Sequence, residues 1–172
     1  MRITITKGER EDRIEAVRAD GSSVCTAFPH KGPVPHDAVH FYVESALAIP
    51  DAFWGTVARG EHPEAIAALA KAAGHASASR AAIPEESIVR LVQAERAVEC
   101  FEADLWGGSG SSPETIRDTI AAGCAQSLVP PLEITDEAIE FIRASLRDML
   151  GRWSAAAVGH HLLLHWRVEL AA

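Results

Sequence analysis

The stretch PHDAVHFYVE, residues 35–44, places two histidines, an aspartate and a glutamate at helical spacing. His36 and His40 are four residues apart, so on a helix their side chains lie about 6 Å apart on one face and can share one metal ion. The positive end of the helix dipole disfavours an imidazolium, which leaves His36 neutral and able to bind a divalent metal such as zinc. The spacing therefore predicts a metal site with His36 and His40 as ligands.

Two carboxylates are candidates for the catalytic base of such a site, Asp37 and Glu44. Asp37 stands where the HExxH zinc proteases carry a glutamate, and its side chain is one methylene shorter. Glu44 lies two turns, about 12 Å of rise, from His36, which is too far for both to reach one ion. We therefore expect Glu44 to hold His40 by a hydrogen bond. A third ligand must come from elsewhere, and His30 is the nearest candidate in sequence.

The same residues have a plainer interpretation as the polar start of a helix. Pro35 opens the helix, Asp37 complements its dipole, and His40 with Glu44 makes an i,i+4 pair. His36 is then a core histidine bonded to a backbone carbonyl. HxxxH alone is a weak signal, so this interpretation, the metal site and a metal-free ligand pocket all stay open, with His62 and His75 as further ligand candidates.

The elements that must position this stretch begin with strands. Ile3 and Ile5 alternate with threonines, and Asp20-Gly21 is typical of a tight hairpin turn between two alternating segments. Residues 1–28 are therefore predicted to form a three-stranded antiparallel meander. Three prolines and a glycine make residues 29–35 an extended connector.

Residues 36–150 have an apolar period of about 3.6 and are predicted to be helical. We expect a flexible joint near residues 107–112, GGSGSS, and we expect Gly151 to end the last helix. The predicted helices run from Pro35 to near Pro50, over 52–59, over 63–73, from Pro84 to Trp106, from Pro113 to the prolines at 130–131, and from Thr135 onward.

The end of the chain returns to an alternating pattern over residues 160–170. Leu162, Leu164, Trp166 and Val168 form one apolar face. A single strand cannot satisfy its own backbone, so it is predicted to pair with the N-terminal meander. The expected fold is α+β and a single domain over 1–172, with four antiparallel strands and about five to six helices packed on one face.

The composition excludes some classes of partner. A formal net charge of −8, with basic residues spread among acidic ones, excludes a surface for nucleic acid or anionic membrane. The longest apolar run is too short to span a bilayer. Three widely spaced cysteines without a CxxC pair favour reduced thiols in a cytoplasmic protein. Self-association is left open.

Three segments carry a resemblance to a known group of proteins. They are FPHKGPVPHDAVHFYVESAL, the following AFWGTVARG and the terminal LLLHWRVEL. Together they resemble a group of small uncharacterised bacterial proteins that share the PHDxxHxxVE stretch. The resemblance implies a bacterial origin and assigns no role to any residue, because the group has no established activity.

Three functions are consistent with these patterns. The first is a non-catalytic binding or interaction domain, because no complete catalytic set can be assembled. The second is a metal-dependent hydrolase with His36 and His40 as ligands and Asp37 or Glu44 as base. The third is a small-molecule binder whose pocket lies between the first helix and the sheet.

Overall fold

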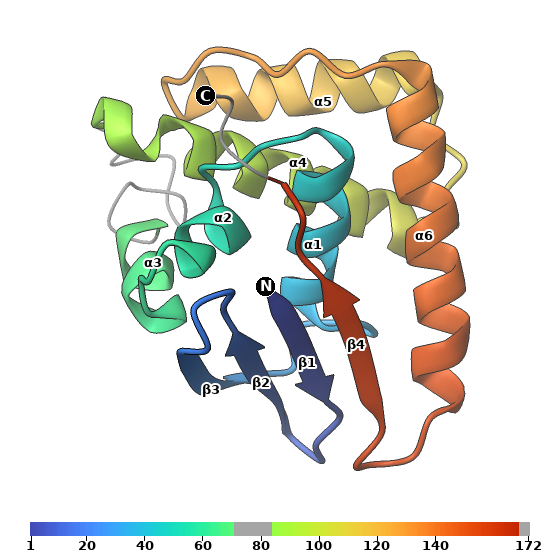
Figure 1. The fold of residues 1–172 in the computed structure, drawn as a ribbon. Coiled ribbons are helices and arrows are strands. Elements are labelled where there is room, and N and C mark those ends of the chain that lie inside the picture. The colour runs from blue at the N-terminus through green and yellow to red at the C-terminus, as the bar shows by residue number, and fades with distance from the viewer. Residues whose placement is uncertain (71–83, 169–172) are drawn as a thin grey trace.

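The computed structural model describes residues 1–70 and 84–168. Figure 1 shows a four-stranded sheet beneath a layer of helices. The elements are β1 (Arg2–Thr6), β2 (Glu11–Val17), β3 (Ser23–Pro29), α1 (His36–Ala46), α2 (Phe53–Ala58), α3 (Pro63–Ala70), the 3₁₀ turn η3 (Glu86–Ile88), α4 (Val89–Trp106), α5 (Pro113–Gln126), α6 (Asp136–Ala155) and β4 (His161–His165). The predicted α+β fold is confirmed.

The sheet joins both ends of the chain. Its order is β3-β2-β1-β4, and each neighbouring pair is antiparallel. Ile5 lies opposite Ile14 on β2 and opposite Leu162 on β4. The β2–β3 turn contains Gly21 at φ +84°, a conformation that glycine adopts without steric cost. The N-terminal meander and the returning strand are therefore both present as predicted.

The sheet has one buried face and one exposed face. Ile3, Ile5, Ile14 and Leu164 belong to the core. Residues that alternate with them are half-buried, as Thr4 is, or exposed, as Leu163 is. β4 ends at His165, but Trp166 extends the pairing because its backbone N–H donates to the Met1 carbonyl at 2.9 Å. The alternation in the sequence thus assigns the inward face correctly.

Helix α1 lies between the sheet and the other helices (Figure 1), where it contacts α2, α4 and α6. Val39 and Val43 on α1 are fully buried in the core, together with Val98 and Phe101 on α4 and Ile142 on α6. Because α1 is covered on several sides, polar residues on more than one of its faces are removed from solvent.

Four predicted helix ends are wrong. α1 ends at Ala46 instead of near Pro50, and α5 ends at Gln126, before the prolines at 130–131. α6 continues past Gly151 to Ala155, and Trp153 in this last turn is buried. An interior glycine costs about 1 kcal/mol relative to alanine, which is less than burial of a large side chain contributes. The start of α4 also differs from the prediction. This helix begins at Val89 instead of Pro84, because Glu85 is extended and the 3₁₀ turn η3 precedes the helix.

Segment 107–112, expected to be a flexible joint, is a turn between α4 and α5. Gly108 has φ +87°, and the Asp104 carboxylate accepts a hydrogen bond from the Ser111 backbone N–H at 3.2 Å. The Ser112 hydroxyl then caps α5 by accepting from the Thr115 N–H at 3.1 Å. Side-chain hydrogen bonds at both ends of the turn therefore fix how α5 leaves α4.

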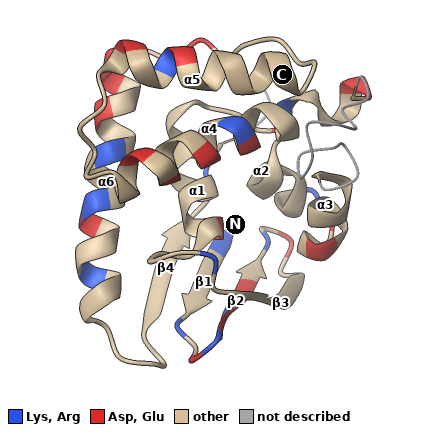
Figure 2. Ribbon diagram, turned by 180° about the vertical axis from the view of Figure 1, so that it is seen from behind, with Lys and Arg blue, Asp and Glu red and all other residues tan. Residues whose placement is uncertain are grey.

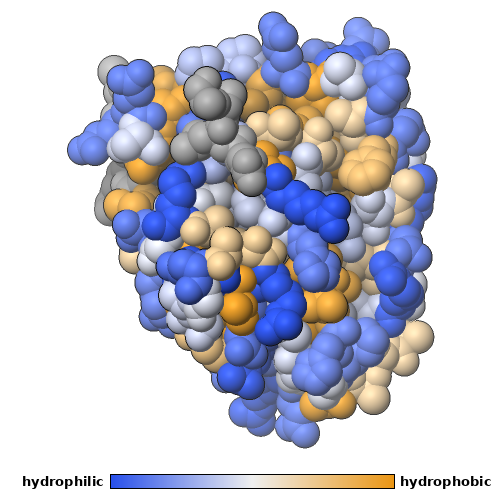
Figure 3. All heavy atoms as spheres, in the orientation of Figure 1, coloured by the Kyte–Doolittle hydropathy of each residue, from blue (hydrophilic) through white to orange (hydrophobic). Residues whose placement is uncertain are grey.

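The surface carries both signs of charge. Figure 2 shows acidic and basic residues interspersed along α4, α5 and α6. On the face seen in Figure 3, hydrophobic areas are small and divided by hydrophilic residues. Within residues 1–70 and 84–168, none of the helices has the length and apolar character needed to cross a membrane.

Candidate metal centre

The site begins at the N-terminus of α1. The Pro35 carbonyl accepts hydrogen bonds from the backbone N–H groups of Ala38 at 3.0 Å and Val39 at 3.3 Å, which starts the helix directly after the proline-rich connector. His36 and His40 follow one turn apart, with ring centroids 4.8 Å from each other in an edge-to-face arrangement. The two imidazoles therefore lie side by side on the part of α1 that meets α4.

Helix α4 brings two glutamates to these rings. Nε2 of His40 is 3.5 Å from Oε1 of Glu95. Nε2 of His36 is 3.9 Å from the other carboxylate oxygen of Glu95, Oε2. Nδ1 of His36 is 2.9 Å from Oε1 of Glu102. Glu95 thus faces both imidazoles through their Nε2 atoms, while Glu102 binds the opposite nitrogen of one of them.

Glu44 holds the second ring. Its side chain is completely buried, and Oε1 lies 2.8 Å from Nδ1 of His40. The carboxylate also accepts from the backbone N–H of Phe53 at 3.2 Å and of Trp54 at 2.9 Å. The expected hydrogen bond between Glu44 and His40 is therefore present, and the start of α2 fixes Glu44 in place.

The indole of Trp54 ties α2 to α1 a second time. Its Nε1–H donates to the Asp37 backbone carbonyl at 2.8 Å, and the whole side chain is buried. This bond sets how α2 packs on the first turn of α1. The position of the Glu44 carboxylate consequently depends on how α2 packs against α1.

The electrostatic environment shifts the pKa of three groups at the site, His40, Asp37 and Glu44. Burial alone lowers the pKa of His40, but the carboxylates of Glu95 and Glu44 outweigh it and raise this pKa well above its usual value. Burial also raises the pKa of the Asp37 carboxyl and that of the Glu44 carboxyl, where it outweighs the opposing hydrogen bond with His40. In the absence of a metal ion, the site therefore favours a proton on His40 between two carboxylates.

A small cavity opens beside the two rings. Its volume is about 70 Å³, room for roughly two water molecules at about 30 Å³ each. Asp37 and Phe53 line it, and Glu44 does not. The lining residues are Phe28, Pro29, Lys31, His36, Asp37, His40, Phe53, Ala67, Ala70 and Glu95.

The ligand atoms of His36, His40 and Glu95 can bind a single metal ion after small inward movements. One ligand atom from each of His36, His40 and Glu95 lies within 4.8 Å of the others. Three such atoms all lie within about 2.8 Å of a common point, against zinc–ligand bonds of about 2.0–2.2 Å. Inward movements of roughly 0.8 Å or less therefore bring all three atoms to bonding distance.

The other histidines considered as ligands are not part of this group. Nε2 of His30 lies 2.9 Å from Oδ1 of Asp12, and roughly a third of its side chain is exposed. His62 is exposed at the start of α3, where its Nδ1 accepts from the backbone N–H of Glu64. His75 lies outside the described residues.

Two site residues were not predicted, Glu95 and Glu102. Both lie on the side of α4 that carries Leu91, Val98 and Phe101, and both are largely buried. Acidic residues at positions seven apart within an apolar stripe are a signal that they need partners in the interior. The sequence contains that signal, although it does not say which helix supplies the partners.

The chain was also compared with known proteins. No protein-family model, no curated protein and no solved structure matches it. The function must therefore be argued from the site itself.

Proposed function

We propose that the protein binds a divalent first-row transition metal through His36, His40 and Glu95. One observation carries the proposal: each imidazole has a carboxylate at Nδ1 and turns its Nε2 toward Glu95. A ring that donates from Nδ1 keeps a lone pair on Nε2 when it is neutral. Two imidazoles and one carboxylate are the ligand set of many zinc hydrolases and of non-haem iron(II) oxygenases.

Glu102 and Glu44 are positioning residues in this proposal. Metal-binding histidines usually donate their other ring N–H to a carboxylate or carbonyl, which fixes the tautomer and the ring direction. Glu102 serves His36 in this way and Glu44 serves His40. A simple helix start requires neither contact, because it is complete once the first backbone N–H groups have acceptors.

The bound ion supplies Lewis acidity to water in the adjoining cavity. Three protein ligands leave coordination positions open, and the cavity of about 70 Å³ accommodates water beside the ligand atoms. Zinc lowers the pKa of a bound water to about 7, so metal-dependent hydrolysis is the reaction class that follows. Of the two carboxyl groups considered as base, Asp37 lines this cavity, whereas Glu44 is occupied by His40 and two backbone N–H groups.

The competing explanation is an ion network without metal. A protonated His40 between Glu44 and Glu95 pairs with both carboxylates and keeps α1, α2 and α4 together. Such a network supports the non-catalytic binding domain that the sequence also allows. The two explanations differ in one measurable property, the affinity of the folded protein for a divalent ion.

Isothermal titration calorimetry with zinc on protein purified without a histidine tag tests the proposal. We expect one ion per chain. Glu95→Gln should weaken binding by more than about 100-fold, since loss of a partner that only orients a ligand costs about 10–100-fold. His165→Ala is the matched control, because His165 is an exposed strand histidine. Absence of binding in the parent, or equal losses in both variants, would refute the proposal.

A further inference from the structure

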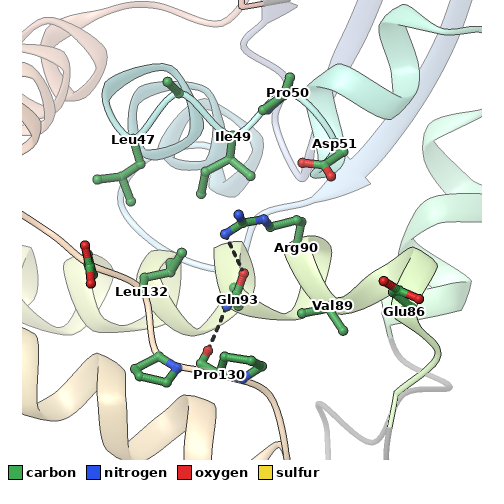
Figure 4. A pocket seen from close by; sticks show the side chains of 13 residues that line it. Leu47, Ile49, Pro50, Asp51, Glu86, Val89, Arg90, Gln93, Pro130 and Leu132 are labelled. Atoms are coloured by element: carbon green, nitrogen blue, oxygen red, sulfur yellow. Dashed lines mark hydrogen bonds between the residues drawn. The ribbon is translucent and has the colours of Figure 1, made fainter. Parts of the chain in front are cut away.

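A second pocket lies apart from the metal centre, where two connecting segments meet the start of α4. It is formed by residues 47–51 between α1 and α2, residues 86–93 at the start of α4, and residues 130–133 between α5 and α6. Its volume is about 1000 Å³, the upper end of the range for small-molecule sites. Figure 4 shows this pocket, which shares no lining residue with the cavity beside the histidines.

A positioned guanidinium faces the pocket. Nη1 of Arg90 donates to Oε1 of Gln93 at 3.1 Å, and Nε2 of Gln93 donates to the Pro130 carbonyl at 2.7 Å. Gln93 is buried, so this chain of bonds orients Arg90 from below (Figure 4). Arg90 itself is exposed, and it forms no ion pair with any residue in 1–70 or 84–168. Its remaining N–H groups are available to an anion.

A carboxylate faces the same space. Asp51, at the end of the α1–α2 connection, lines the pocket together with Arg90, and Figure 4 shows both side chains directed into it. Within the described parts of the chain the two charged groups make no ion pair with each other. A cation and an anion that share a pocket without pairing leave space for a ligand that carries both charges.

The remaining walls are largely apolar. Ile49 is buried and Leu47 and Leu132 are half-buried, and they line one side of the pocket, with Pro50 and Val89 nearby. An aliphatic side chain placed against these residues loses contact with water, which contributes about 25 cal/mol per Å² of buried apolar surface. The pocket therefore offers a cation, an anion and an aliphatic surface within one volume.

We propose that this pocket binds a zwitterion with an aliphatic side chain, an amino acid or a dipeptide. The carboxylate of the ligand pairs with Arg90, whose planar fork suits two parallel hydrogen bonds. The ammonium group lies toward Asp51, and the acidic residues Glu86 and Glu133 at the rim favour the same orientation. The aliphatic side chain packs on Leu47, Ile49 and Leu132. This proposal is independent of the metal centre.

Calorimetric titration with leucine and with leucyl-leucine tests it, because the two differ in the separation of their charges. Leucine is compared with 4-methylpentanoate, which lacks the ammonium group, and with leucinamide, which lacks the carboxylate. Leucyl-leucine is compared with N-acetyl-leucyl-leucine and leucyl-leucinamide, which lack the same charges. We expect one or both zwitterions to bind, and each analogue to bind about 10–100-fold more weakly, the value of one hydrogen-bonded charge. Arg90→Gln should weaken the binding of the zwitterion by a similar factor. The variant protein should bind leucine no more tightly than leucinamide.

Arg147→Gln is the matched control, because Arg147 is an exposed arginine on α6. Thermal melts of all variants establish that they fold. The proposal is overturned if neither zwitterion binds at millimolar concentration, if the singly charged analogues bind equally well, or if Arg147→Gln weakens binding as much as Arg90→Gln.

Discussion

Asparagine in place of Asp104 should destabilise the protein by about 3 kcal/mol at neutral pH. Asp104 on α4 and Arg143 on α6 are both buried, and two bonds join them, from Nε to Oδ2 at 2.9 Å and from Nη2 to Oδ1 at 3.2 Å. Loss of one partner from a buried ion pair costs about 3–5 kcal/mol, because the other charge stays buried. The lower end applies because Glu140 and the Ser111 carbonyl still bind the guanidinium.

The same pair predicts how this difference depends on pH. Burial alone raises the pKa of the Asp104 carboxyl, but hydrogen bonds from Arg143 and Ser111 outweigh it and hold this pKa below its usual value. A group whose pKa is lowered by folding contributes stability above its unfolded pKa, about 3.9 for aspartate, and loses it as the pH falls through the folded value. The free-energy difference between parent and variant should therefore be constant from pH 7 to about 5 and shrink below about 4.

Urea denaturation followed by circular dichroism at pH 7, 5, 4 and 3 measures this difference. The matched control is Glu140→Gln, which removes an acid that also binds Arg143 but is 57% exposed. An exposed pair of this kind contributes about 1 kcal/mol or less. The reasoning is refuted if Asp104→Asn lies within 1 kcal/mol of the parent at pH 7, or if its deficit stays unchanged at pH 3.

Three further predictions follow from other parts of the fold. Gly151→Ala should raise the free energy of unfolding by about 0.5–1 kcal/mol, because an added Cβ meets nothing within 4 Å inside α6, and a lower melting temperature would contradict this. Native protein should react with a thiol reagent rapidly at Cys25 alone, since Cys100 and Cys124 are buried and the pKa of Cys100 is raised to about 11, so rapid labelling of two or more thiols would be inconsistent. Deletion from Leu162 onward removes β4 and should abolish cooperative melting, and a truncated protein with a cooperative transition would contradict the pairing.

The strands were predictable because their signal is local. Alternation around Ile3, Ile5 and Leu164 depends on one buried face, and the β2–β3 turn depends on the conformation of Gly21. The end of α6 was not predictable from Gly151, since the helix continues for another turn in which Trp153, two residues later, packs into the core. Local sequence preference thus determines the strands and the β2–β3 turn, whereas tertiary packing determines where α6 ends.

The candidate site was predictable on one side only. His36, His40 and Glu44 share a helix, so their spacing gave their mutual geometry. Glu95 and Glu102 lie more than fifty residues away in sequence, and their approach depends on how α4 packs on α1. At 100° per residue, helical geometry predicts His36 nearest the apolar stripe of α1, with His40 and Glu44 along the edge of that stripe.

In the structure His40 and Glu44 are more deeply buried than His36, because α2 and α4 cover that edge of α1. The pair is therefore not a surface i,i+4 contact of a few tenths of a kcal/mol. A change at either residue leaves a buried partner unsatisfied, which is a larger cost.

Anomalous diffraction at the zinc edge from crystals grown with zinc tests whether His36, His40 and Glu95 hold one metal ion. We predict one strong peak between α1 and α4, about 2.0–2.2 Å from Nε2 of His36, Nε2 of His40 and a carboxylate oxygen of Glu95. The Nδ1 atoms should keep their bonds to Glu102 and Glu44. A peak elsewhere, or an unchanged cluster with no zinc between the two imidazoles, would contradict the proposal.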